Sequence, residues 1–168
     1  MIVYHGGTEV IEQPMVHIGR AKLDFGKGFY VTTLPEQAET WSKRLSDARK
    51  KVPIINKYEL DIEMSIANYR YKRFESYTLE WLEFIAANRR GGNAWNAYDL
   101  IEGGVADDRV VDTVELYMGG YLPAELAIER LKHFKPNNQL CITNQHLIEQ
   151  GLKFIESFTP KSESNYAE

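Results

Sequence analysis

The sequence predicts an α+β domain with a mixed β-sheet. Short strand-like runs are scattered among helical segments, without the regular alternation of βαβ units. The chain has 168 residues, of which 43% are hydrophobic and 26% charged, and this length suits one domain with a sizeable core. We expect a single domain over residues 1–159, followed by a polar tail over 160–168 that is disordered.

The first third of the domain contains two strand signals separated by a loop. Residues 1–5 are typical of a short buried strand, and residues 6–23 of a loop with at most a short helical piece. Asp24-Phe25-Gly26-Lys27-Gly28 is a glycine-containing turn, and Phe29-Tyr30-Val31-Thr32-Thr33 has the composition of a strand. Composition alone favours a hairpin turn followed by a core strand.

A helix is predicted from this strand to about Arg49. Thr33 can cap it, Glu36 completes a capping box, and Pro35 lies in the first turn. Its apolar face holds three residues at helical spacing: Ala38, Trp41 and Leu45. We expect Trp41 to lie in the core rather than to serve as a stacking platform.

A strand over 54–64 and a helix over 77–89 follow. In the strand, apolar residues alternate with three carboxylates, which we expect to be solvated rather than to bind a metal: Glu59, Asp61 and Glu63. The helix ends at Gly91-Gly92. It has four residues spaced for burial: Leu79, Leu82, Ile85 and Ala86.

The last third continues the mixed pattern of strands and helices. A strand is predicted over 98–104, and Asp107 or Asp108 is expected to cap a helix over 109–118. The remaining elements are a helix over 123–134, a strand over 139–143, a helical turn over 145–150 and a strand over 152–158.

Composition limits the classes of partner and compartment. The net charge of −4 argues against stable binding of long duplex nucleic acid, although a local basic patch is compatible with it. The single cysteine, Cys141, excludes an internal disulfide framework and favours a reducing compartment. No run is apolar enough to span a bilayer, and no signal peptide is evident, so we expect a cytoplasmic protein that binds no membrane and no metal.

Two motifs together resemble the ADP-ribosyltransferase superfamily, in the branch of poly(ADP-ribose) polymerases and diphtheria-toxin-like enzymes. The first is Tyr4-His5-Gly6, at the end of the first strand, and the second is Asp24-Phe25-Gly26-Lys27-Gly28-Phe29-Tyr30. With an Ala-Asp-Asp segment and a late Gln-initiated strand, the chain looks more closely like a small, poorly characterised bacterial family of that superfamily. The resemblance implies a split, mixed or antiparallel sheet with flanking helices. It also implies an enzyme that cleaves the nicotinamide–ribose bond of NAD and transfers ADP-ribose to a macromolecular acceptor.

The resemblance also implies roles for individual residues. His5 would hydrogen-bond a ribose hydroxyl of the adenosine half, Gly6 would hold the nicotinamide carboxamide through its backbone, and Tyr30 would stack on the nicotinamide ring. Gln139 stands where the superfamily usually has a glutamate, so the catalytic set would be His5, Tyr30 and Gln139. The NAD-binding set adds four residues: Gly6, Arg20, Gly28 and Phe29.

Several alternatives stay open. Glu102 or Asp107 could supply the carboxylate that Gln139 lacks, and Asp107 or Asp108 could instead orient a substrate group. Arg20, Lys22 and Lys27 could meet a pyrophosphate, although we expect both lysines to be merely solvated.

The function also has alternatives. The enzyme could be the toxin of a bacterial toxin–antitoxin pair with a cognate antitoxin protein, and its acceptor could be a protein or a nucleic acid. A catalytically idle NAD- or ADP-ribose-binding module acting through a protein partner is the main alternative. A weaker one is an enzyme similar to RNA 2′-phosphotransferases, against which the acidic balance and the lack of clustered arginines argue.

Overall fold

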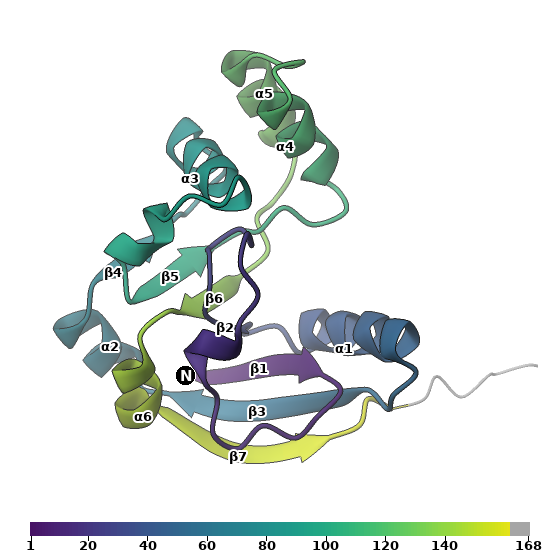
Figure 1. The fold of residues 1–168 in the computed structure, drawn as a ribbon, viewed down its shortest axis with the longest axis vertical. Helices are drawn as coiled ribbons and strands as arrows, with labels where there is room; N and C mark the ends of the chain where they lie inside the picture. Colours follow the sequence, from purple (N-terminus) through teal and green to yellow (C-terminus); the bar gives the residue numbers. More distant parts are fainter. Residues whose placement is uncertain (162–168) are drawn as a thin grey trace, which may run out of the picture.

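The computed structural model describes residues 1–161 and has an α+β architecture built on two sheets (Figure 1). The three-stranded sheet is antiparallel, with the order β1 (Ile2–Gly7), β3 (Ile54–Leu60) and β7 (Leu152–Phe158). The four-stranded sheet has the order β2 (Phe29–Val31), β6 (Gln139–Ile142), β5 (Leu100–Gly103) and β4 (Tyr71–Arg73). Only β4 and β5 are parallel, so this sheet is mixed. The predicted α+β class is confirmed.

Helices flank both sheets, and Figure 1 shows α3, α4 and α5 together at one end of the molecule and α1 beside β1 at the other. The α-helices of the described residues are α1 (Pro35–Arg49), α2 (Ile62–Asn68), α3 (Leu79–Arg89), α4 (Val111–Met118), α5 (Ala124–Leu131) and α6 (Gln145–Gly151). Two 3₁₀ turns, η1 (Val16–Ile18) and η2 (Ala94–Ala97), lie in the loops. None of the helices within residues 1–161 combines the length and the apolar character needed to cross a membrane.

The two sheets meet at a single bridge between β1 and the residue after β2. Tyr4 and Thr32 exchange two backbone hydrogen bonds, of 2.8 and 2.9 Å, and no further pairing joins these strands in the described part of the chain. The strands therefore separate beyond the bridge. β1 itself runs to Gly7, two residues past the predicted end.

The four-stranded sheet is buried on both faces, which explains the continuous apolar runs of its strands. On one face, Ile101 and Cys141 pack against α3, α4 and α5 in a core that includes Trp81 and Leu131. The other face packs against the three-stranded sheet and α6 through a second apolar cluster: Val3, Tyr58, Leu140, Ile142 and Leu147. Residues on neighbouring positions of β5 and β6 thus face opposite sides.

Helix α1 ends at Arg49 with Pro35 in its first turn, as predicted, but the predicted cap is wrong. Leu34 is the N-cap residue and makes no side-chain cap bond. The Thr33 hydroxyl instead donates to Asn138 Oδ1 at 3.2 Å. A tertiary contact with the segment before β6 thus replaces the local capping bond.

The predicted strand over 54–64 is too long. Alternation holds through Tyr58 and Leu60, which are fully buried, and then Asp61 accepts a hydrogen bond from the Met64 N–H and begins α2. Asp61 is therefore a helix cap, and the three carboxylates do not share one strand face. In the described part of the chain, no group of three His, Cys, Asp or Glu residues is arranged to hold a metal.

Two expectations for the later helices also need correction. Leu79, predicted to be buried, is 45% exposed in the first turn of α3, whereas Leu82, Ile85 and Ala86 are buried as predicted. Helix α4 begins at Val111, and neither aspartate caps it: Val110 is the N-cap residue and makes no side-chain bond. The Asp107 carboxylate instead accepts hydrogen bonds from the side chains of Arg109 and Asn137.

The remaining predicted elements are present with shifted ends, as β5, α5, β6, α6 and β7. The short elements α2 and β4 do not follow from the sequence pattern. Most of the predicted tail, residues 162–168, lies outside the described residues.

Candidate functional site

The backbone of Gly6 is unpaired at the point where β1 and β2 separate. Alternate residues of β1 direct their N–H and C=O groups toward β3 or away from it, and Tyr4 directs its groups away, to Thr32. Gly6 lies two residues further on and faces the same way, next to the strand that carries Tyr30. Within residues 1–161 its N–H and C=O have no hydrogen-bond partner there. A donor and an acceptor are thus available side by side.

Glycine is required at this position because β1 lies against α1. A Cβ on Gly6 would lie 2.0 Å from the Ala38 carbonyl oxygen and 3.0 Å from the Ser42 nitrogen, both backbone atoms. Ala38 and Ser42 are also the buried residues of α1. The close approach fixes the first turns of the helix beside the unpaired Gly6 backbone.

His5 is held on both its edge and its face. Its Nδ1 lies 2.7 Å from the Tyr30 carbonyl oxygen, and its ring stacks on Phe29 with centroids 4.5 Å apart. A carbonyl oxygen only accepts, so Nδ1 carries the hydrogen. Burial lowers the pKa of His5, an effect that the bond to Tyr30 partly offsets. The ring is therefore neutral near pH 7, and Nε2 is an acceptor.

The hydroxyl of Tyr30 is bound internally, and only its ring is available to a ligand. The hydroxyl donates to the Gly26 carbonyl at 2.6 Å and accepts from the Phe25 N–H at 3.1 Å. Gly26 has φ +78°, which glycine adopts without strain, and this turn brings both groups to the hydroxyl. Burial raises the pKa of Tyr30 far above its ordinary value, so it stays neutral. The half-buried ring fits a platform and not an acid or base.

Gln139 is a buried amide without a partner. It is the first residue of β6 and only 4% exposed, and no hydrogen bond to its side chain exists among the described residues. Tyr30 pairs with Cys141, so Gln139 lies diagonally across from Tyr30 on the same face of the sheet. Such diagonal neighbours are about 7–8 Å apart. Among the described residues the only fully enclosed side-chain N or O atom without a partner is the Tyr77 hydroxyl, so the amide atoms of Gln139 reach the surface and are available to a ligand.

The remaining predicted NAD-binding residues have different surroundings. Phe29 is buried behind the His5 ring and supports it. Gly28 presses on β6, because a Cβ there would lie 2.5 Å from the Ile142 carbonyl oxygen and 2.6 Å from Cys141 Sγ. Arg20 is exposed in the loop before β2 and has no ion pair within residues 1–161. The structure therefore places His5, Gly6, Phe29 and Tyr30 where β1 and β2 separate, and Gln139 diagonally across from Tyr30, but it leaves Arg20 at the surface. The His5 ring lies with Phe29 on the face of β2 opposite to the Tyr30 ring.

Neither alternative carboxylate is free in this site. Glu102 pairs with Leu140, so it lies on the opposite face of the sheet from Gln139. It accepts hydrogen bonds from Asn138 Nδ2, at 3.1 Å, and from the Tyr71 hydroxyl. Asp107 is occupied by Arg109 Nη2, at 2.8 Å, and by Asn137 Nδ2, at 3.2 Å.

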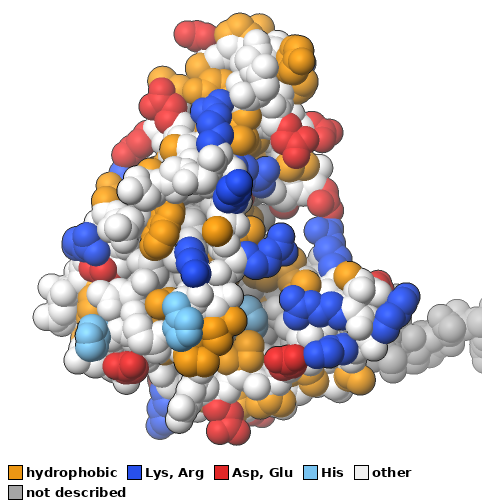
Figure 2. Space-filling model, in the orientation of Figure 1, with side chains coloured by type: hydrophobic (Ala, Val, Ile, Leu, Met, Phe, Trp, Pro, Cys, Tyr) orange, Lys and Arg blue, Asp and Glu red, His pale blue; other side chains and the backbone are white. Residues whose placement is uncertain are grey.

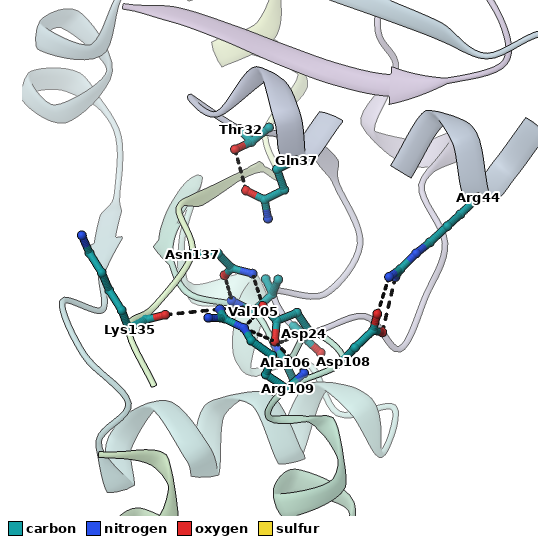
Figure 3. A network of polar contacts seen from close by, with 11 residues as sticks. Asp24, Thr32, Gln37, Arg44, Val105, Ala106, Asp108, Arg109, Lys135 and Asn137 are labelled. Carbon is teal, nitrogen blue, oxygen red and sulfur yellow. Dashed lines mark hydrogen bonds and ion pairs between the residues drawn. The ribbon is translucent and has the colours of Figure 1, made fainter. Parts of the chain in front are cut away.

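A cavity of about 440 Å³ lies between α1 and two segments, the one that follows β5 and the one that precedes β6. One wall comes from α1 and the residue before it: Leu34, Gln37, Thr40, Trp41 and Arg44. The other wall consists of Val105 to Arg109 and of Asn137. Figure 3 shows Arg44 reaching across to pair with Asp108, and beside this pair Arg109 donates to the Lys135 carbonyl oxygen.

Trp41 lines this cavity and is half-buried, so the expectation of a core tryptophan is wrong. The buried stripe of α1 is narrow, because Gly6 contacts the helix at Ala38 and Ser42, and Trp41 lies beside that stripe. Nothing in the sequence marks Gln37 as a lining residue. The Pro-Asn-Asn turn before the predicted strand at Gln139 is the one signal that points to Asn137.

A larger hollow, of about 610 Å³, lies at the C-terminal end of β3 and is lined by Glu59, Asp61, Glu63 and Glu149 among others. Neither hollow is lined by His5, Gly6, Tyr30 or Gln139, but the smaller one is lined by Asn137, two residues before Gln139, and by Gln37, which contacts Thr32.

Charge also distinguishes this face of the molecule. Figure 2 shows Lys and Arg side chains gathered across the middle of the face, between the helical end and α1, with acidic side chains mostly toward its margin. The net charge of −4 is therefore unevenly distributed. This face favours an anionic ligand.

Fold and site together define an α+β protein whose two sheets separate beside an unpaired glycine backbone, a neutral histidine and a buried free amide. The chain belongs to the family described as "Protein of unknown function (DUF3990)", which matches residues 1–154. No curated protein and no solved structure matches the chain.

Proposed function

We propose that this protein is an NAD-dependent ADP-ribosyltransferase with an ADP-ribosyltransferase-like split sheet. The observation that carries the proposal is the presence of four groups without a hydrogen-bond partner among the described residues, at and beside the point where β1 and β2 separate: the Gly6 backbone, His5 Nε2, the Tyr30 ring and the Gln139 amide. These groups match the chemistry of the nicotinamide and the two riboses of NAD.

The Gly6 backbone is complementary to the nicotinamide carboxamide. A primary amide needs one acceptor for its NH₂ and one donor for its oxygen, and the unpaired C=O and N–H of Gly6 provide both. The ring of Tyr30, on the neighbouring strand, supports stacking of the nicotinamide. The anchored hydroxyl holds that ring in a single orientation.

His5 Nε2 suits a ribose hydroxyl, because it can only accept a hydrogen bond while the ring is neutral. The pyrophosphate of NAD would lie toward the cationic middle of the face, where Arg20 is a candidate for a charge-assisted bond.

Gln139 would act at the reacting ribose. The bond between C1′ and the nicotinamide nitrogen breaks, its electron pair stays on nicotinamide, and the ribose becomes an oxocarbenium ion. The Gln139 amide oxygen can accept from the ribose 2′-hydroxyl and direct its dipole at that cation. An acceptor nucleophile then bonds to C1′ and loses its proton, and the cavity that begins at Asn137, two residues before Gln139, is a candidate route for its approach.

Label transfer tests this proposal. NAD labelled in its adenylate phosphate is incubated with the protein and a cell lysate, and incorporation is followed into protein and nucleic acid separately. We expect incorporation that is lost in His5→Ala and kept in the matched control His146→Ala, an exposed histidine on α6. Equal incorporation by both variants would contradict the role of His5.

The proposal extends to a toxin of a toxin–antitoxin pair. Expression would then arrest growth in the wild type, and His5→Ala would be harmless. Arrest by both proteins would count against a toxic activity at this site.

A second candidate function is a catalytically idle module that binds NAD or ADP-ribose and acts through a protein partner. The uncharged side chain of Gln139 favours it, because an amide stabilises a cation less than a carboxylate does. Calorimetry separates the two candidates: binding of NAD without release of nicotinamide supports the module, and turnover excludes it.

A further inference from the structure

Asp24 connects three parts of the structure. It is 7% exposed and begins the turn Asp24–Gly28, which we call the platform turn because it anchors the Tyr30 hydroxyl. One carboxylate oxygen pairs with Arg89 Nε of α3 at 2.5 Å, and the other accepts from the Ala106 N–H at 2.7 Å. Figure 3 shows Asp24 beside Ala106, Val105 and Arg109.

Each contact of Asp24 fixes a different element. Ala106 belongs to the cavity wall over Val105–Arg109, and Arg89 belongs to the helical end of the molecule. The backbone carbonyl of Asp24 also accepts from Asn88 Nδ2 at 2.9 Å. The two carboxylate oxygens are thus committed to different partners, and one side chain sets the distance between the platform turn and the cavity wall.

The platform turn links the position of Asp24 to the position of the Tyr30 ring. Phe25, the next residue, donates its N–H to the Tyr30 hydroxyl, and Gly26 accepts from it. The Gly26 backbone also packs on Trp95, since a Cβ there would lie 1.9 Å from the indole. A displaced Asp24 therefore displaces the groups that hold the ring.

We propose that Asp24 is a positioning residue for ADP-ribose transfer, which keeps the Tyr30 platform in register with the cavity wall. The proposal rests on the proposed function. Both carboxylate oxygens of Asp24 are bound to protein donors, so its role is exerted through Tyr30 and Ala106. Its charge balances Arg89, whose side chain is 21% exposed.

The central variant is Asp24→Asn, which keeps the shape of the side chain and replaces one acceptor oxygen by a donor NH₂. Both partners of Asp24 are donors, so one contact becomes a donor–donor conflict. We expect the kcat for nicotinamide release to fall about 10- to 100-fold, because small misplacements of reacting groups have effects of this order. The KM for NAD should change less, since the Gly6 and His5 groups are retained.

A double variant distinguishes positioning from general damage. Asp24→Asn combined with Arg89→Gln turns the conflict into a matched pair, in which the new NH₂ can donate to the new amide oxygen. We expect kcat to recover at least severalfold relative to Asp24→Asn alone. Hydrogen exchange at the Phe25 and Ala106 amides should rise together in the single variant and fall again in the double variant.

The matched control is Asp99→Asn. Asp99 is 6% exposed and paired with Arg70, but it contacts neither the platform turn nor the cavity wall. We expect this control to lower stability and leave kcat unchanged. An unchanged kcat in Asp24→Asn with an active wild type would overturn the positioning role alone, as would equal losses of kcat in Asp24→Asn and Asp99→Asn. A wild type that releases no nicotinamide would overturn the proposed function and the positioning role together.

Discussion

The pairing of Asp99 with Arg70 predicts a defined dependence of stability on pH. Asp99, just before β5, accepts from Arg70 Nη2 at 2.8 Å and from the Arg70 backbone N–H at 2.9 Å. Asn144, the N-cap residue of α6, donates to the same carboxylate at 3.1 Å. The substitution Asp99→Asn removes the charge and keeps the shape, and it also places one NH₂ against donors, so the part of its effect that changes with pH reports the charge.

The hydrogen bonds from Arg70 lower the pKa of Asp99 from its ordinary value of 3.8 to about 2. A shift of one unit corresponds to about 1.4 kcal/mol, so the bound carboxylate could contribute about 2.5 kcal/mol to the free energy of unfolding. The Arg70 side chain is 60% exposed, and solvent screening reduces this to about 1–2 kcal/mol.

Urea unfolding of wild type and Asp99→Asn between pH 7 and pH 2 measures the effect. Because the folded pKa is depressed, the contribution is complete above the unfolded value near 3.8 and is lost as the pH falls through about 2. We therefore expect the wild type to be more stable by about 1–2 kcal/mol at pH 7 and the difference to narrow below pH 4. A difference that stays constant down to pH 2, or no difference at pH 7, would refute this reasoning.

Three further predictions concern the site itself. Gln139→Glu should raise the rate of NAD hydrolysis about 10- to 100-fold, because a carboxylate would lie beside the developing cation; an unchanged rate would mean that Gln139 is not at the reacting ribose. Gly6→Ala should lower the free energy of unfolding by about 1–3 kcal/mol or more, since the added methyl meets the Ala38 carbonyl. Calorimetry of this variant should show no NAD binding. A variant as stable as the wild type would refute the contact between Gly6 and α1. Burial lowers the pKa of His5, so the unfolded chain binds a proton more readily and the free energy of unfolding falls below about pH 6.5. In urea titrations His5→Gln should therefore lose less stability than the wild type between pH 7 and pH 5. If both proteins lose the same free energy of unfolding over this range, a buried neutral His5 is contradicted.

Local signals were sufficient where a residue's neighbours in sequence decide its structure. Pro35 marks the first turn of α1, and apolar runs mark β5 and β6, which are buried on both faces. The Gly26 turn and the strand at Tyr30 are likewise local, since φ +78° at glycine precedes a run of β-formers. These features could be predicted from the sequence. The predicted hairpin is wrong, because β2 pairs with β6 and, among the described residues, no strand leads into the turn.

Other features depend on contacts between distant segments. Thr33 is a good cap by composition, but its hydroxyl bonds to Asn138, about a hundred residues away. Alternation after Leu60 favours a longer strand, yet Asp61 caps α2 instead. Trp41 has core spacing, but the contact of β1 with α1 narrows the buried stripe and leaves it beside a cavity. Periodicity describes one element and does not show which face a neighbour covers.

The same distinction applies to the candidate site. The motifs suggest His5, Tyr30 and Gln139, but only the fold shows that Gln139 lies on the Tyr30 face and that Glu102 lies on the other. The unpaired Gly6 backbone follows from the single bridge at Tyr4. Whether the Gly6 backbone is accessible depends on how the two sheets separate, and this cannot be predicted from a local sequence pattern.

The most direct test of the central claim is the release of nicotinamide from NAD by the purified protein. It is measured for the wild type, His5→Ala and Tyr30→Ala, with and without lysate, and Tyr121→Ala is the control because that ring is 82% exposed on the α4–α5 connection. We predict release by the wild type and the control, stimulated by lysate, and none by the two site variants. A folded wild type that releases no nicotinamide under any condition would contradict the proposed transferase.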